Sequence, residues 1–68
     1  MTLEHLMLSV ELQGNITIKV YDYDKEEYTA SIDHYDPNVN LFEEYGDYYV
    51  KFIYDGTDGD VVIEIAKE

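Results

Sequence analysis

The stretch ITIKVYDYDKEEYTASI, residues 16–32, decides how the rest of the chain is interpreted. Over residues 16–21, apolar side chains alternate with polar or aromatic ones, and this period of two is typical of a strand with one buried face. The polar segment 22–27 predicts a turn, after which the alternation resumes over residues 28–32. The stretch therefore predicts a β-hairpin whose connecting turn is acidic.

The residues before this hairpin also alternate. Every second residue from 6 to 12 is apolar: Leu6, Leu8, Val10 and Leu12. The segment Gln13-Gly14-Asn15 that follows predicts a tight turn, because glycine adopts the positive φ that such turns need. The first half of the chain therefore predicts a three-stranded antiparallel meander.

The pair Asp36-Pro37 interrupts the strand pattern. Asp36 suits the N-cap of a helix, and Pro37 suits the first helical position, where a missing N–H costs nothing. Three apolar residues then recur at every third position: Val39, Phe42 and Tyr45. We expect a helix over residues 37–45 that ends at Gly46 in a left-handed cap.

Two further strands are predicted after the helix, over residues 48–54 and 61–65, with a turn over 55–59. The sequence thus predicts a single α+β domain, residues 1–68. Its elements follow the order β-β-β-α-β-β, which forms a five-stranded antiparallel sheet with one short helix.

Composition limits the function. The chain has 68 residues, 16 acidic and four basic side chains, no cysteine and a formal net charge of -12. The length excludes a multidomain enzyme, and without cysteine there is no disulfide. All four basic residues are lysines, so no bidentate arginine fork is available for phosphate, and direct nucleic-acid binding is not expected. No apolar run has the length of a membrane span. The charge predicts a positively charged partner.

The acidic residues gather in three segments, 22–27, 33–47 and 55–60. If the strand after the helix starts beside the end of the third strand, the first and last acidic turns share one edge of the sheet. If the helix crosses the sheet, these turns lie at opposite ends, and the sequence leaves both arrangements open. The candidate partner-binding residues are Asp22, Asp24, Glu26, Glu27, Glu43, Glu44, Asp47, Asp55, Asp58 and Asp60, together with Tyr21 and Tyr23.

Two features favour a function for this charge over a role in solubility alone. Glu43 and Glu44 fall in the last turn of the predicted helix, where the macrodipole disfavours anions by about 0.3–1 kcal/mol each. Duplex DNA carries one negative charge per ~1.7 Å of axis, so twelve charges correspond to ~20 Å of duplex, close to the size of the domain. A solvated acidic surface that only maintains solubility is the alternative.

The tyrosines and other chemically suggestive residues have simpler interpretations. Tyr28, Tyr48 and Tyr54 fit half-buried strand positions, whereas Tyr21 and Tyr23 also suit interface anchors. The aspartates of residues 55–60 lack the spacing of a calcium loop. His5 and His34 have no second histidine at ligand spacing, so no metal or other cofactor is expected. The run Ser31-Ile32-Asp33-His34 contains the residue types of a triad, but neighbouring strand residues point to opposite faces, and we expect no enzyme.

The size, the acidity and the segment Tyr21-Asp22-Tyr23-Asp24-Lys25-Glu26-Glu27-Tyr28 resemble the DNA-mimicking inhibitors of phages and mobile elements, which include anti-CRISPR proteins, anti-restriction proteins and inhibitors of uracil-DNA glycosylase. The resemblance implies a stoichiometric inhibitor that acts in the cytoplasm of a bacterial host by occupying the cationic groove of a nucleic-acid-binding enzyme. An acidic antitoxin or immunity protein for a basic toxin is the alternative. Exposed edge strands also make a homodimer reasonable.

Overall fold

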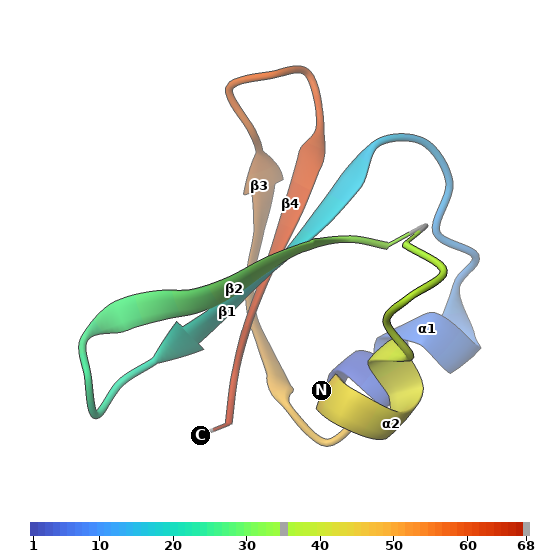
Figure 1. Ribbon diagram of the computed structural model, residues 1–68. Helices are drawn as coiled ribbons and strands as arrows, with labels where there is room; N and C mark the ends of the chain where they lie inside the picture. The colour runs from blue at the N-terminus through green and yellow to red at the C-terminus, as the bar shows by residue number, and fades with distance from the viewer. Residues whose placement is uncertain (35, 68) are drawn as a thin grey trace.

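The computed structural model describes residues 1–34 and 36–67. Four strands form one mixed sheet in the order β2-β1-β4-β3, and two short helices accompany it (Figure 1). The elements are α1 (Leu3–Ser9), β1 (Ile16–Asp22), β2 (Glu27–Asp33), α2 (Leu41–Tyr45), β3 (Tyr49–Asp55) and β4 (Val61–Ala66). The α+β class is confirmed, whereas the predictions of five strands, an all-antiparallel sheet and a single helix are wrong.

The missing fifth strand is the N-terminal segment, which forms helix α1 instead. The hydroxyl of Thr2 accepts a hydrogen bond from the N–H of His5 and caps the helix. Leu3 and Leu6 are buried on one side of the helix, while Leu8, which the strand pattern had placed beside Leu6, is 73% exposed. The helical spacing of the buried leucines therefore overrides the alternation that predicted a strand.

Helix α2 is shorter than predicted and starts later. Asn40 is its N-cap, and its side-chain oxygen accepts a hydrogen bond from the N–H of Glu43 at 3.2 Å. Asp36 accepts from the N–H of Asn38 at 2.9 Å and thus organises a turn before the helix. Gly46 has φ −58° and ψ −34°, so the predicted left-handed cap is wrong. Gly46 is still required, because a Cβ there would meet the carbonyl oxygen of Phe42.

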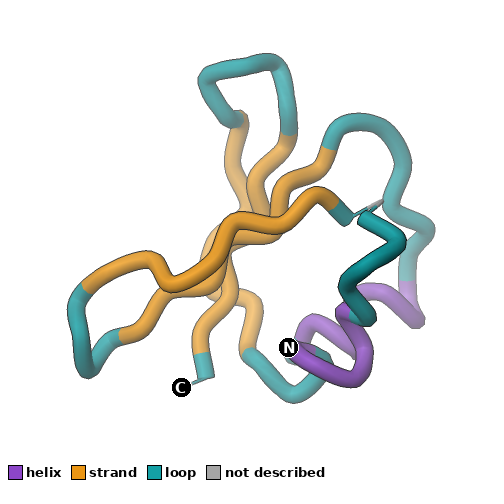
Figure 2. Tube along the Cα trace, viewed as in Figure 1, coloured by secondary structure: helices purple, strands orange, loops and turns teal. Residues whose placement is uncertain are grey.

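The path of the chain explains the mixed sheet. β1 and β2 form the predicted hairpin, and the connection through α2 then carries the chain from β2, at one edge, to β3, at the other. β3 and β4 form a second hairpin whose returning strand lies beside β1 and runs parallel to it. Figure 2 shows both helices on the same side of the sheet. The other side of the sheet, called here the open face, is covered by neither of these two helices.

The core lies between the helices and the covered side of the sheet. It is mainly aliphatic, and its members with at most 9% exposure are Leu3, Leu6, Ile16, Ile18, Val20, Ile32, Leu41, Ile63 and Ile65. The strands predicted at 16–21, 28–32, 48–54 and 61–65 are all present, with small shifts in their bounds. The hairpin and the two C-terminal strands are therefore the parts of the fold that the alternation predicts correctly.

Two irregularities change which face some side chains occupy. The pairing of β1 with β2 skips Thr29, so that Tyr28 lies opposite Tyr21. The pairing of β3 with β4 skips Lys51, so that Phe52 lies opposite Glu64. After each skipped residue the alternation is out of phase with the pattern before it, as expected for a β-bulge. Tyr28 and Phe52 consequently lie on the open face.

Candidate functional site

The two acidic turns lie at opposite ends of the sheet. Because β1 and β4 are parallel, Ile16 pairs with Val61 at one end, and Tyr21 pairs with Ala66 at the other. The β3–β4 turn lies at the first end and the β1–β2 turn at the second, as Figure 1 shows. Of the two arrangements that the sequence left open, the structure therefore has the one with the turns apart.

The candidate residues around α2 lead into the sheet at the end that holds the β1–β2 turn, although Figure 1 shows α2 itself well apart from that turn. They precede Tyr49, the first residue of β3, which pairs with Ala66 at that end. This end, called here the hairpin end, has the candidates Asp22, Asp24, Glu26, Glu27, Glu43, Glu44, Asp47, Tyr21 and Tyr23. The opposite end, called here the far end, has Asp55, Asp58 and Asp60. The candidates thus form two separate groups and no single continuous stripe.

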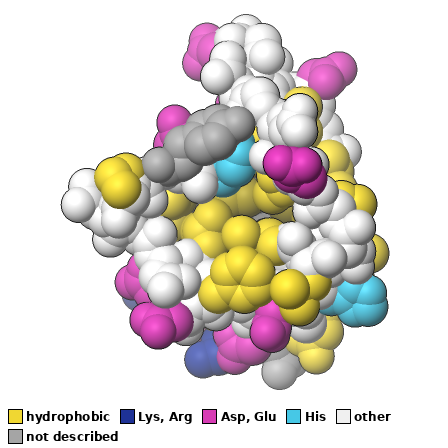
Figure 3. Space-filling view, turned by 90° about the vertical axis from the view of Figure 1, so that its right-hand side faces the viewer, with side chains coloured by type: hydrophobic (Ala, Val, Ile, Leu, Met, Phe, Trp, Pro, Cys, Tyr) yellow, Lys and Arg dark blue, Asp and Glu magenta, His cyan; other side chains and the backbone are white. Residues whose placement is uncertain are grey.

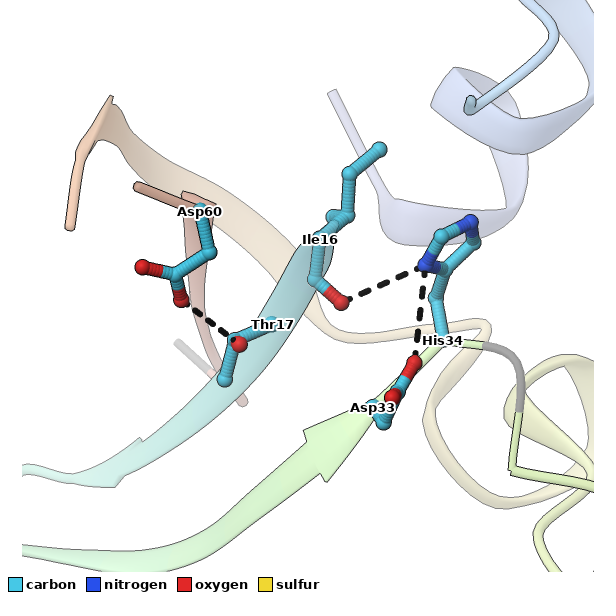
Figure 4. Close-up of polar contacts among 5 residues, drawn as sticks. All are labelled: Ile16, Thr17, Asp33, His34 and Asp60. Carbon is cyan, nitrogen blue, oxygen red and sulfur yellow. Dashed lines mark hydrogen bonds and ion pairs between the residues drawn. The ribbon is translucent and has the colours of Figure 1, made fainter. Parts of the chain in front are cut away.

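Two of the predicted carboxylates hold turns in place. Asp22 accepts hydrogen bonds from the backbone N–H groups of Asp24 at 2.9 Å and Lys25 at 3.2 Å. Asp60 accepts from the hydroxyl of Thr17 at 2.8 Å (Figure 4), and this bond holds the pKa of Asp60 below its ordinary value. A Cβ on Gly56 would collide with the Asp60 carboxylate, so a larger residue there would require the Asp60 side chain to move. Asp22 and Asp60 therefore stabilise the turns beside which they lie, and this role is separate from any contact with a partner.

The remaining acidic candidates are exposed: Asp24, Glu26, Glu27, Glu43, Glu44, Asp47, Asp55 and Asp58. Glu43 and Glu44 lie in the first turn of α2, because the helix begins at Leu41. The predicted dipole penalty for these two residues is therefore wrong, since anions are favourable near a helix N-terminus. Their charge gives no sign of stability sacrificed for function.

A buried carboxylate on the open face was missed by the sequence analysis. Glu64 is 8% exposed, and its Oε2 atom accepts hydrogen bonds from the hydroxyls of Tyr28 at 2.9 Å and Tyr54 at 3.2 Å. The donors come from the two edge strands and the acceptor from the central strand β4. The available signal was one charged residue within the apolar segment VVIEIA, residues 61–66.

The hydrogen bonds to Glu64 change how its tyrosine partners ionise. The hydrogen bond that the Tyr28 hydroxyl donates to the Glu64 carboxylate is the chief cause that raises the pKa of Tyr28 to about 12. The pKa of Tyr54 is also raised, first by burial of its hydroxyl and then by the same carboxylate. Both tyrosines are therefore held as neutral donors, as structural residues would be.

The candidates Tyr21 and Tyr23 belong to an aromatic cluster with Tyr28. The ring of Tyr21 lies 5.0 Å from that of Tyr23 and 5.0 Å from that of Tyr28, both edge to face. Lys51 extends from β3 with its Nζ atom 5.9 Å from the ring of Tyr23 and 5.6 Å from that of Tyr49. Two rings of the cluster therefore have a lysine of the chain within cation–π distance: Tyr23 has Lys51, and Tyr28 has Lys19 at 5.7 Å.

Near the aromatic cluster is an open cleft of about 730 Å³ at the hairpin end. Its lining residues are Val20, Asp22, Tyr23, Asp24, Thr29, Tyr48 and Lys67. On the helical side of the molecule, Figure 3 shows apolar side chains in a hollow, with Asp and Glu side chains placed around it. Carboxylates and apolar side chains thus lie next to each other on this side of the molecule.

The side chain of His34 lies beside the backbone of Ile16, the first residue of β1. Its Nδ1 atom lies 3.2 Å from the carbonyl oxygen of Ile16 and 3.9 Å from Oδ1 of Asp33 (Figure 4). Asp33 and His34 therefore approach each other more closely than strand alternation predicts. The His34 side chain is only 7% exposed, whereas that of Asp33 is 71% exposed. The contact of His34 with the carbonyl oxygen of Ile16 connects the end of β2 to the start of β1.

Within residues 1–34 and 36–67, no group of three or more His, Asp or Glu side chains is arranged to hold a metal ion. Neither helix that the structure describes is long and apolar enough to cross a membrane. Comparisons of the chain with protein-family models, curated proteins and solved structures found no match.

Proposed function

We propose that the protein is a non-enzymatic acidic binding protein that occupies the cationic groove of a DNA- or RNA-binding enzyme and inhibits it by competing with nucleic acid. The observation that carries the proposal is the placement of exposed carboxylates at the two ends of one sheet. At the hairpin end they include Asp24, Glu26 and Glu27, and at the far end Asp55 and Asp58.

The spacing of these groups supports the proposal. β1 has seven residues, so the two ends are roughly 20 Å apart at ~3.3 Å per residue. A duplex of that length carries about twelve phosphate charges at one per ~1.7 Å. The chain has the same formal net charge, -12, on a body of 31 × 26 × 23 Å. A groove shaped for a short length of duplex would therefore face about as many negative charges on this protein as on the duplex, over a similar distance.

The aromatic cluster adds apolar contact area to the charged groups. Tyr23 is 51% exposed and lies in the β1–β2 turn beside Asp24. Tyrosine is enriched among the residues that contribute most to protein interfaces. The exposed ring supports a protein partner, with the carboxylates steering its association and the ring contributing contact area.

The proposal is tested by capture from a nuclease-treated bacterial lysate on the immobilised protein at low salt. The expected partner is a DNA- or RNA-binding enzyme that rising salt releases, that duplex DNA displaces, and whose activity falls when the protein is added in equal amount. If the captured partner is a basic toxin that DNA does not displace, the antitoxin alternative replaces the proposal. Capture of no nucleic-acid-binding protein would contradict it.

Matched variants locate the contact on the captured partner. One variant neutralises the hairpin end with Asp24→Asn, Glu26→Gln and Glu27→Gln, and a second neutralises the far end with Asp55→Asn and Asp58→Asn. Asp22 and Asp60 stay unchanged because they hold the turns. Each variant is expected to bind about tenfold more weakly, or about 1.4 kcal/mol.

The control for both variants is the pair Glu4→Gln and Glu11→Gln. These two carboxylates are also exposed and lie in α1 and in the loop after it, and neither is among the residues that the two variants change. Glu4 lies beside Gly46, next to the α2 candidates that both variants leave unchanged. The control is expected to retain wild-type affinity. An equal loss in all three variants would mean that binding follows net charge alone and that the two ends have no special role.

A further inference from the structure

β3 is an edge strand with apolar side chains exposed on both of its faces. Phe52 and Tyr54 lie on the open face and are 59% and 40% exposed, and Ile53 lies on the opposite face and is 56% exposed. The two helices do not cover Ile53, although Val50 on the same face packs against the core. A long edge strand with exposed apolar residues is a site where another strand can add to the sheet.

Part of this edge already accepts a strand. Thr2 forms an antiparallel bridge with Tyr49, and the flanking backbone bonds join Leu3 N–H to Tyr48 O and Val50 N–H to Met1 O, each at 2.8 Å. The N-terminal residues therefore occupy the edge beside residues 48–50. Within the described chain, no backbone hydrogen bond joins another segment to the outer edge of residues 52–55.

The backbone groups of this free segment are oriented outward at two residues. Val61 donates its N–H to Asn15 O, on the side of β4 away from β3, so Val62 and Glu64 turn theirs toward β3. Their partners in β3 are Tyr54 and Phe52. Ile53 and Asp55 alternate with these residues, and they therefore present N–H and C=O groups to the free edge.

We propose that the free part of β3 pairs with the same segment of a second copy of this chain, in antiparallel orientation about a two-fold axis at Ile53. Ile53 then lies opposite Ile53 of the partner, and Phe52 lies opposite the partner's Tyr54 on the open face. An isologous contact of this kind uses one surface on both copies. It covers exposed apolar side chains on both faces of the strand.

Charge complementarity favours a second copy in this register. β3 contains one lysine and one aspartate, so it has no formal net charge although the chain has -12. The two-fold axis at Ile53 brings Lys51 of one copy opposite the partner's Asp55. The rest of the two surfaces is acidic and repels. The dimer is therefore expected to tighten as salt rises, whereas the proposed binding to a cationic groove weakens.

Sedimentation or light scattering at several protein concentrations measures the dimer. The mass is expected to rise from 8.0 kDa toward twice that value with concentration, and more steeply when salt rises from about 0.1 M to about 1 M, which shortens the Debye length from roughly 10 Å to 3 Å. Ile53→Lys is expected to keep the mass at 8.0 kDa. The control Leu8→Lys, at a residue 73% exposed in α1, is expected to dimerise as the wild type does.

Cross-linking tests the register, because the chain has no cysteine of its own. In the hydrogen-bonded pair at the axis the two Cα atoms are ~5.5 Å apart, within the range of a disulfide. Ile53→Cys is therefore expected to form a covalent dimer when the thiol oxidant diamide is added. Tyr49→Cys is the control, since it lies on the same strand with 47% exposure and its two copies are roughly 26 Å apart in this register.

Three results would overturn the proposal. The wild type remains at 8.0 kDa at high salt and high concentration, Ile53→Lys dimerises as well as the wild type, or Ile53→Cys cross-links no faster than Tyr49→Cys. Asp55 belongs both to the far end and to this dimer contact, whereas the hairpin end lies outside it. The variant that neutralises the hairpin end therefore tests the proposed function independently of the dimer.

Discussion

The two faces of strand β4 are both buried, but by different means. On the helical side, Ile63 and Ile65 are 2% and 0% exposed beneath α1, α2 and neighbouring aliphatic residues. On the open face, Val62 and Glu64 are 2% and 8% exposed with no helix above them. There the covering groups are side chains of the edge strands, including the rings of Tyr28 and Tyr54.

The two faces therefore contribute to the stability of the domain through different interactions. The helical face is an aliphatic core in which removal of a methyl group leaves a cavity. The open face is one layer of half-exposed rings around a hydrogen-bonded carboxylate. Its contribution to stability depends on the hydrogen bonds to that carboxylate and on the pH. We therefore expect the helical face to account for most of the stability and the open face to add a smaller, pH-sensitive part.

The largest expected effect is in the aliphatic core. Ile18 is 0% exposed, and Ile18→Ala should lower the free energy of unfolding by about 2–5 kcal/mol, because the cavity adds to the lost transfer energy. Urea denaturation followed by circular dichroism measures the change. The control Leu8→Ala, at an exposed position, should stay within about 0.5 kcal/mol of the wild type. Similar losses in both variants would contradict the assignment of the core.

A smaller effect is expected on the open face. Glu64→Ala leaves the hydroxyls of Tyr28 and Tyr54 without their shared acceptor, and it should cost about 1–3 kcal/mol in the free energy of unfolding. Glu64→Gln keeps an acceptor oxygen and should cost less. The same denaturation experiment compares the three proteins. A Glu64→Ala variant as stable as the wild type would show that the network contributes nothing.

The smallest expected effect is a loss of stability in alkali. The folded pKa of Tyr28 is about 12 against 10.0 for the free side chain, so its neutral form is favoured by folding. Its contribution is complete below pH 10.0 and is lost as the pH rises toward about 12. Stability measured across this range should fall, and phenolate absorbance should show a late-titrating fraction that includes Tyr28. In Glu64→Gln that tyrosine should titrate earlier, and an unchanged titration would exclude the carboxylate as the cause.

The sequence predicts the fold where one periodicity stands alone. Residues 16–32 alternate with no competing pattern, and they form the hairpin as predicted. Residues 3–9 satisfy two patterns at once, since Leu6 belongs both to the alternation with Leu8 and to the helical spacing with Leu3. Burial decides between them, because the helix places both Leu3 and Leu6 in the core. That choice depends on tertiary contacts which local propensity does not contain.

The candidate site is predictable in composition more than in arrangement. The acidic turns are visible as polar segments, but their separation depends on the parallel pairing of β1 with β4, which the connection between residues 33 and 49 determines. The bulges at Thr29 and Lys51 leave no mark in the pattern, yet they turn Tyr28 and Phe52 to the open face. Glu64 was missed because one of its two partners, Tyr28, lies 36 residues away in the sequence.

The central claim is that the carboxylates at the two ends of the sheet form a surface for a cationic groove. Displacement of the captured enzyme by duplex DNA, measured with the wild type, the two end-neutralised variants and the Glu4→Gln, Glu11→Gln control, tests it most directly. The account predicts that DNA competes with the wild type and the control, and that either end-neutralised variant is displaced at about a tenth of the DNA concentration. Displacement of all four proteins at one DNA concentration, or no displacement at all, would contradict it.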